Sequence, residues 1–136
     1  PISAFAKALP ALKNLQDAVG QAAKRGYITG IDGRVIRVRH THAALNTLLQ
    51  SAGALLCKYW LCATFERITQ EFTYGKDFVF LTWIHDEAGY GARTKEIAER
   101  IATINIEECT KVGVQFGWRC PLAGEAKIGR SWAETH

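Results

Sequence analysis

The stretch FVFLTWIHDEAGYGAR, residues 78–93, decides the fold expected for this chain. Its first seven residues are almost all apolar or β-branched at both alternating positions, which predicts a strand covered on both faces of a sheet. The apolar run then breaks into His85, Asp86 and Glu87 before AGYGAR resumes as a second strand. The stretch therefore predicts a hairpin over 78–92 with a histidine and two carboxylates at its bend.

The surrounding sequence predicts helices and one more hairpin. Pro10 suits the first turn of a helix, Gly26 suits the position beyond its end, and Thr41 and Thr94 suit N-caps. Without a repeat or a linker, residues 1–136 are expected to form a single α+β unit. The expected elements are a helix over 10–25, a hairpin over 27–39, a long helix over 42–70, the hairpin over 78–92, a helix over 95–112, a strand over 114–120 and a tail over 121–136.

The strand over 114–120 rests on the segment VQFGWRC, in which apolar and polar residues alternate as in a half-buried strand. Gly113 directly precedes it and is expected to stop the helix before it.

Composition indicates one domain with enough apolar residues for a core: 136 residues, 48% hydrophobic and 22% charged. No apolar run approaches the roughly 20 residues that cross a bilayer, and the N-terminus lacks a signal-peptide pattern, so a cytoplasmic protein without a membrane partner is expected. The chain contains no methionine. It is therefore expected to be either a fragment or a short gene product whose initiator before Pro1 was trimmed. The cysteines, expected to be reduced and buried because they lack Cys-x-x-Cys or zinc-finger spacing, are Cys57, Cys62, Cys109 and Cys120.

The net charge of +4 is concentrated in a short basic segment. Such a cluster is typical of a protein that binds a polyanion, and it is equally typical of a solvated basic face. The segment contains Lys24, Arg25, Arg34, Arg37 and Arg39, with His40 and His42 at its end.

The acids at the hairpin bend are candidate metal ligands. Mg²⁺ takes oxygen ligands and commonly needs only one or two protein carboxylates together with substrate phosphates. Asp86 and Glu87 are therefore adequate for half of a magnesium site. The other reading is that they are solvated turn residues, since acids are common in turns.

A polar stripe runs along the predicted long helix, where His42, Asn46 and Gln50 recur at every fourth residue and Gly53 follows. Amide donors match the purine N3 and pyrimidine O2 acceptors that all base pairs present in the minor groove, and a helical glycine admits another backbone. The stripe therefore predicts a duplex-DNA contact that does not read sequence. The alternative is an ordinary solvated helix face.

Three segments together resemble the C-terminal palm segment of family A DNA polymerases, and most closely the T7-like phage replicative enzymes. They are DGRVIRVRHTHAALNTLLQSAGALLCK (32–58), WIHDE (83–87) and WRCPLAGEAKIGRSWAETH (118–136). The resemblance implies part of a right-hand palm, with an antiparallel sheet whose catalytic β-hairpin packs on long helices. It also implies DNA-directed DNA polymerase activity by two-metal nucleotidyl transfer onto a primer 3′-hydroxyl.

The resemblance assigns roles residue by residue. Asp86 looks like a carboxylate that binds both catalytic Mg²⁺ ions, Glu87 looks like an auxiliary ligand, and His85 would contact the primer-terminal nucleotide. The terminal carboxylate would lie near the active site or would only complete the palm. The remaining implied residues are Asn46 and Gln50 as minor-groove readers, His42 on the same stripe, Arg39 at a phosphate, and His136 as the C-terminal residue.

The chain also departs from the family pattern. It lacks the Asp-Tyr-Ser motif with the second catalytic aspartate, the fingers helix that holds the triphosphate, the thumb and the exonuclease. We therefore expect it to be inactive alone and to share its two metal ions with an aspartate on a missing segment or on a separate N-terminal polymerase polypeptide, as a heterodimer. The expected partners are primer-template DNA and dNTP, in the cytoplasm of an infected bacterium if the chain is phage-encoded.

Two other functions remain open from the sequence. One is a metal-dependent nuclease that combines Asp86, Glu87 and His85 with Asp77 or Asp32. The other is a non-catalytic DNA-binding accessory subunit, which would keep its function after a change at Asp86.

Overall fold

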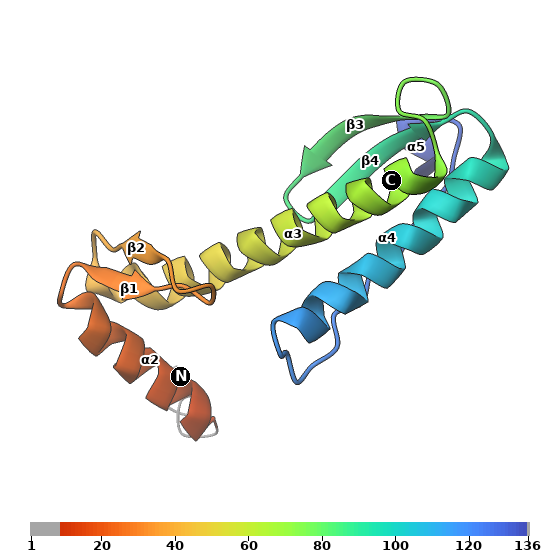
Figure 1. The fold of residues 1–136 in the computed structure, drawn as a ribbon. Coiled ribbons are helices and arrows are strands. Elements are labelled where there is room, and N and C mark those ends of the chain that lie inside the picture. The colour runs from red at the N-terminus through yellow and green to blue at the C-terminus, as the bar shows by residue number, and fades with distance from the viewer. Residues whose placement is uncertain (1–8, 136) are drawn as a thin grey trace. The chain divides into compact units, whose positions relative to one another are not determined.

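A computed structural model of the chain describes residues 9–135. It has the predicted α+β composition, with long helices and two separate two-stranded antiparallel sheets (Figure 1). The chain divides into two compact units between Gly53 and Ala54, so the expectation of a single unit is not met. The physical reason is that the buried side chains form separate apolar clusters, each built from elements close in sequence.

The first unit contains a helix followed by a small hairpin. Gly26 has φ +84°, which lets the chain reverse after the helix, and Gly33 has φ +83° in the turn between the strands. The predicted helix and hairpin are confirmed, although each strand is only three residues long. The elements are α2 (Pro10–Ala23), β1 (Tyr27–Thr29), β2 (Val35–Arg37), the 3₁₀ turn η1 (Thr41–Ala43) and the start of α3 (Ala44–Glu71). The core residues are Val19, Ala23, Ile28, Val38 and Ala44.

The long helix α3 starts differently from the prediction. His40 precedes η1 with extended backbone, φ −137° and ψ 126°, and no side chain caps the turn. Thr41 already lies inside the 3₁₀ turn, so the prediction of Thr41 as N-cap is wrong. The span of the helix agrees closely with the predicted 42–70.

The second unit packs a β-hairpin beside two helices (Figure 1). The side-chain oxygen of Thr94 accepts a hydrogen bond from the Ile97 N–H at 3.4 Å, which confirms the predicted cap. None of the described helices is long and apolar enough to span a membrane. The elements are the rest of α3, β3 (Phe78–Ile84), β4 (Glu87–Ala92), α4 (Lys95–Gln115) and α5 (Trp132–Thr135). The core residues are Ile68, Phe78, Ile101 and Ile104.

The predicted strand over 114–120 is wrong, because α4 continues through Gly113 to Gln115. Val114 is 74% exposed, and in the described chain the segment pairs with neither strand of the β3–β4 hairpin, so its alternating residues gain no sheet hydrogen bonds. Gly113 is buried, and a Cβ there would lie 2.9 Å from the Cγ of Leu122. The glycine therefore admits the irregular tail against α4 instead of ending the helix.

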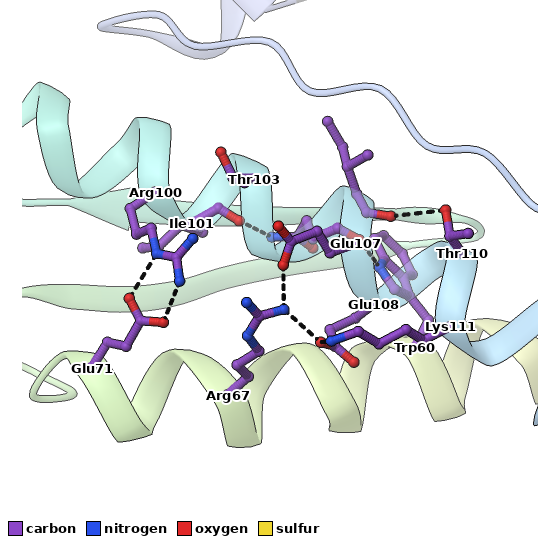
Figure 2. A network of polar contacts seen from close by, with 12 residues as sticks. Trp60, Arg67, Glu71, Arg100, Ile101, Thr103, Glu107, Glu108, Thr110 and Lys111 are labelled. Atoms are coloured by element: carbon purple, nitrogen blue, oxygen red, sulfur yellow. Dashed lines mark hydrogen bonds and ion pairs between the residues drawn. The ribbon is translucent and has the colours of Figure 1, made fainter.

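Ion pairs join α3 to α4 (Figure 2). Arg100 on α4 donates hydrogen bonds of 2.6 and 2.7 Å to the two carboxylate oxygens of Glu71 on α3. Arg67 on α3 pairs with both Glu107 and Glu108 on α4. These contacts fix the two helices beside which the hairpin lies.

Candidate functional site

The hairpin carries the candidate catalytic residues on a tight turn. The register pairs Ile84 with Glu87, so His85 and Asp86 form a two-residue connection between β3 and β4. His85 has φ +55°, a backbone conformation that is uncommon for residues other than glycine. The predicted hairpin over 78–92 is therefore confirmed, and its histidine lies in a constrained part of the turn.

Aromatic side chains in the strands stabilise the hairpin next to the turn. Trp83 donates its indole N–H to the carbonyl oxygen of His85 at 2.9 Å, which ties the turn to the last residues of β3. Phe80 and Tyr90 pack edge to face across the strands at 5.4 Å. Burial raises the pKa of Tyr90 to about 12, so its hydroxyl stays neutral at physiological pH. The turn of the hairpin is thus exposed, while the strands next to it are held by packed aromatic side chains.

The three residues at the tip face solvent, and Asp86 lies near α3. His85, Asp86 and Glu87 are all exposed. Burial raises the pKa of the Cys57 thiol on α3, and the negative charge of nearby Asp86 raises it further. The sequence did not predict that Cys57 lies near Asp86, because 28 residues separate them and no motif contains both.

The four cysteines are free, as predicted, but not all of them are buried. Cys57 and Cys109 are half-buried, whereas Cys62 and Cys120 are exposed.

The tip by itself fits only half of a metal site. Asp86 and Glu87 are adjacent in the chain and both exposed, and their carboxylate oxygens are the kind of ligand that hard cations prefer. Among residues 9–135, however, no group of three or more His, Cys, Asp or Glu side chains is arranged to hold a metal ion. Any pair of cations would therefore need ligands from beyond these residues.

The additional acids considered for a nuclease are engaged elsewhere. Asp77 precedes β3 and Asp86 follows it, so the whole length of the seven-residue strand, about 20 Å at about 3.3 Å per residue, separates them. The Asp77 carboxylate accepts a hydrogen bond from the Thr73 N–H at 2.9 Å, and the Asp32 carboxylate pairs with Arg34 at 2.6 Å. The structure does not bring Asp77 to the hairpin tip.

The predicted polar stripe is exposed on the first unit. Asn46 and Gln50 lie one turn apart on α3, and His42 lies in η1 and stacks on His40 with ring centroids 5.5 Å apart. A Cβ built at Gly53 would meet nothing within 4 Å, so the helix surface is open there. The residues that the sequence assigned to this stripe therefore form an accessible track.

The remaining predicted site residues are Arg39 and His136. Arg39 is exposed and forms no ion pair among residues 9–135. His136 lies outside the described residues.

Comparison with known proteins relates the sequence of this chain to one class of polymerase. No protein-family model matches the chain. The chain is similar to a segment of the DNA-directed DNA polymerases of T7-like phages, which confirms the resemblance found from the sequence.

Two of these relatives come from Enterobacteria phage T3 and Escherichia phage T7. Each is 45% identical over 116 residues, or 83% of this chain and 16% of the relative. A DNA-directed DNA polymerase of Escherichia phage Phieco32 is 31% identical over 135 residues, or 93% of this chain and 21% of the relative. The chain therefore spans about a fifth or less of the length of the curated relatives it matches.

Proposed function

We propose that this chain is the C-terminal palm segment of a family A DNA-directed DNA polymerase. The observation that carries the proposal is the hairpin tip. A two-residue turn places Asp86 at an exposed position on a supported hairpin, in a chain that matches phage polymerases at 45% identity over 83% of its length. Asp86 at such a tip is accessible to a primer end and to a nucleotide from outside the chain.

The carboxylates of Asp86 and Glu87 would hold two Mg²⁺ ions together with an aspartate supplied by another part of the polymerase. Such ions activate a primer 3′-hydroxyl and stabilise the charge that develops on pyrophosphate. Asp86 would be the shared ligand and Glu87 the auxiliary one. His85, held by the hydrogen bond from Trp83 to its carbonyl oxygen, would position the primer-terminal nucleotide.

The stripe on the first unit would hold the duplex behind the primer end. Asn46 and Gln50 would donate hydrogen bonds to minor-groove acceptors, which are similar for all base pairs. His42 would continue these contacts by one turn, and Arg39 would neutralise a backbone phosphate. The chain would therefore bind primer-template DNA irrespective of its sequence.

The outer face of β3 supports the need for a further polypeptide. The sequence predicts a strand covered on both faces, yet Leu81 is 65% exposed and Val79 is 37% exposed, and both side chains lie over Gly91 on the same face of the hairpin. A contiguous apolar face of this kind marks an interface. We propose that the rest of the polymerase, as a separate N-terminal polypeptide in a heterodimer or as a continuous chain, covers this face and supplies the dNTP-binding residues. On this proposal the chain alone is inactive, and it acts in the cytoplasm of a phage-infected bacterium.

Primer extension tests the proposal. The phage T7 relative lacking the matched segment is assayed alone, with this chain, and with its Asp86→Asn variant, in Mg²⁺ and all four dNTPs. The chain is also assayed alone. We expect synthesis only in the unmutated mixture, with a loss of at least about 10³-fold for Asp86→Asn, because removing this carboxylate removes a shared metal ligand. A fused chimera of the two pieces provides the same comparison if the separate pieces do not associate.

Asp77→Asn is the matched control, because it makes the same chemical change at the opposite end of β3. The new amide oxygen can still accept the hydrogen bond from the Thr73 N–H, so extension should be retained. Full activity of the Asp86→Asn mixture or chimera would reduce the chain to an accessory role. Mg²⁺-dependent cleavage of DNA by the chain alone, lost in Asp86→Asn, would identify a nuclease instead.

A further inference from the structure

The net positive charge of the chain comes entirely from its first unit. Residues 1–53 contain seven lysines and arginines against two aspartates, whereas residues 54–136 contain ten against eleven acids. Both aspartates are already neutralised, since Asp17 pairs with Lys13 at 3.1 Å and Asp32 pairs with Arg34 at 2.6 Å. The other cations described in this unit, which form no ion pair within residues 9–135, are Lys24, Arg25, Arg37 and Arg39.

Three of these cations gather around one tyrosine on the outer face of the β1–β2 hairpin. Tyr27 pairs directly with Arg37 across the strands, so the two side chains lie on the same face. Ile28, which points the other way, is 2% exposed, whereas Tyr27 is 38% exposed. The register thus separates an inner apolar face from an outer face that contains an aromatic ring and a guanidinium group.

Arg25 and Arg39 extend this outer face. The Arg25 guanidinium lies over the Tyr27 ring, 5.2 Å from its centroid, and its Nε donates to the Ala22 carbonyl oxygen at 3.4 Å. Val38 is buried and its N–H bonds to the Gly26 carbonyl oxygen at 2.9 Å, so the alternation continues and Arg39 is exposed beyond Arg37. Tyr27 therefore has the Arg25 guanidinium over its ring and Arg37 as its cross-strand neighbour on the same face.

A partly exposed aromatic ring with exposed arginines on the same face matches the chemistry of an unpaired nucleic-acid strand. Bases stack on aromatic rings and on guanidinium planes, while arginines bind the phosphates between them. The bases of duplex DNA are stacked inside the helix, so a duplex would contact only the arginine charges and not the tyrosine ring. An acidic protein surface would likewise use the arginines and leave the ring without a role.

We propose that the outer face of the β1–β2 hairpin, formed by Arg25, Tyr27, Arg37 and Arg39, binds single-stranded DNA. This surface is separate in its chemistry from the Asn46 and Gln50 stripe, whose amides suit a duplex minor groove. The binding itself does not depend on catalysis. Its assignment to the unpaired template strand next to the primer rests on the proposed function.

Fluorescence anisotropy with the full chain tests the proposal, with a labelled 20-nucleotide oligo-dT and a labelled blunt duplex as probes. Tyr27→Ala should weaken oligo-dT binding about ten-fold, because stacking contributes about 1–3 kcal/mol per base. Tyr27→Phe, which keeps the ring, should bind within about two-fold of the unmodified chain. Duplex binding should change less than two-fold in both variants.

Salt titration separates charge from stacking. Arg37→Ala should lower the slope of log K against log salt for oligo-dT by about 0.7, the value for one phosphate of a single strand. Lys13→Ala is the matched control, because it removes the same charge from the same unit at a lysine that already pairs with Asp17, and its slope should be unchanged.

Equal oligo-dT affinities for Tyr27→Ala and the unmodified chain would overturn the proposal, as would equal losses for oligo-dT and duplex. Circular dichroism of each variant confirms that the hairpin unit is folded. If Tyr27→Ala is unfolded, Arg37→Ala serves as the readout, and an unchanged salt slope for oligo-dT in that variant would overturn the proposal. Asp86→Asn should bind oligo-dT normally. Failure of primer extension with intact oligo-dT binding would therefore count against the proposed polymerase role alone.

Discussion

Ile104 provides a quantitative test of how the hairpin is supported. It is fully buried on α4 in the cluster with Ile68, Ile101 and Phe78, the first residue of β3. Ile104→Ala removes Cγ1, Cγ2 and Cδ1, each worth about 0.8 kcal/mol in transfer free energy, or about 2.4 kcal/mol together. A residual cavity of about 50 Å³ adds about 1.2 kcal/mol at 24 cal/mol per Å³. The free energy of unfolding of the second unit should therefore fall by about 3.5 kcal/mol.

Tryptophan fluorescence during urea or thermal unfolding measures this loss selectively, because all four tryptophans belong to the second unit. At the size of this unit, residues 54–136, the midpoint temperature should fall by roughly 14 to 28 °C. The control is Ile106→Ala on the same helix, where the side chain is 39% exposed, and it should cost less than half as much. Equal losses for the two variants would refute the assignment of Ile104 to the core beneath the hairpin.

Three further outcomes are expected. Thr94→Ala should lower the free energy of unfolding by about 1 kcal/mol through loss of the α4 N-cap, whereas Thr94→Ser should retain it; equal urea midpoints for the two variants would contradict the cap. The hydrogen bonds from Arg100 hold the pKa of Glu71 below its usual 4.5, so Glu71 stabilises the folded state above that value and this contribution is lost as pH falls through the lower folded pKa. Urea midpoints measured from pH 6 to pH 3 should therefore fall less steeply in Glu71→Gln, and an unchanged slope would argue against the pair. Trp83→Phe removes the donor to the His85 carbonyl oxygen and should increase amide hydrogen exchange at the turn, with little change at the base of β3; protection equal to that of the unmodified chain would rule out the tie.

Local sequence patterns predicted the elements whose determinants are short-range. Pro10, Gly26 and Thr94 marked a helix start, a helix end and a cap, and the structure has each of them. The hairpin with His85 at its bend was also predictable, because the change from apolar to polar residues is abrupt. These signals act through backbone conformation and hydrogen bonds within a few residues, which the sequence states directly.

Contacts between residues distant in sequence decided the features that local sequence patterns did not predict. The segment after Gly113 has the alternation of a strand, yet it continues a helix and then a tail, because no neighbouring strand pairs with it in the described chain. Gly113 was expected to end the helix, but it lies within α4, where Leu122 packs so close that a Cβ would not fit. The proximity of Cys57 to Asp86 likewise depends on how the hairpin packs beside α3.

The sequence by itself determined the polar stripe, the acidic hairpin bend and the relation to phage polymerases, because each depends on residue types at fixed local spacing. Only the tertiary structure decided that Tyr27 pairs with Arg37 beneath the Arg25 guanidinium and that the outer face of β3 stays uncovered. The physical reason is that strand register and burial depend on which distant segments pair and pack, and those pairings are not encoded in the spacing of neighbouring residues.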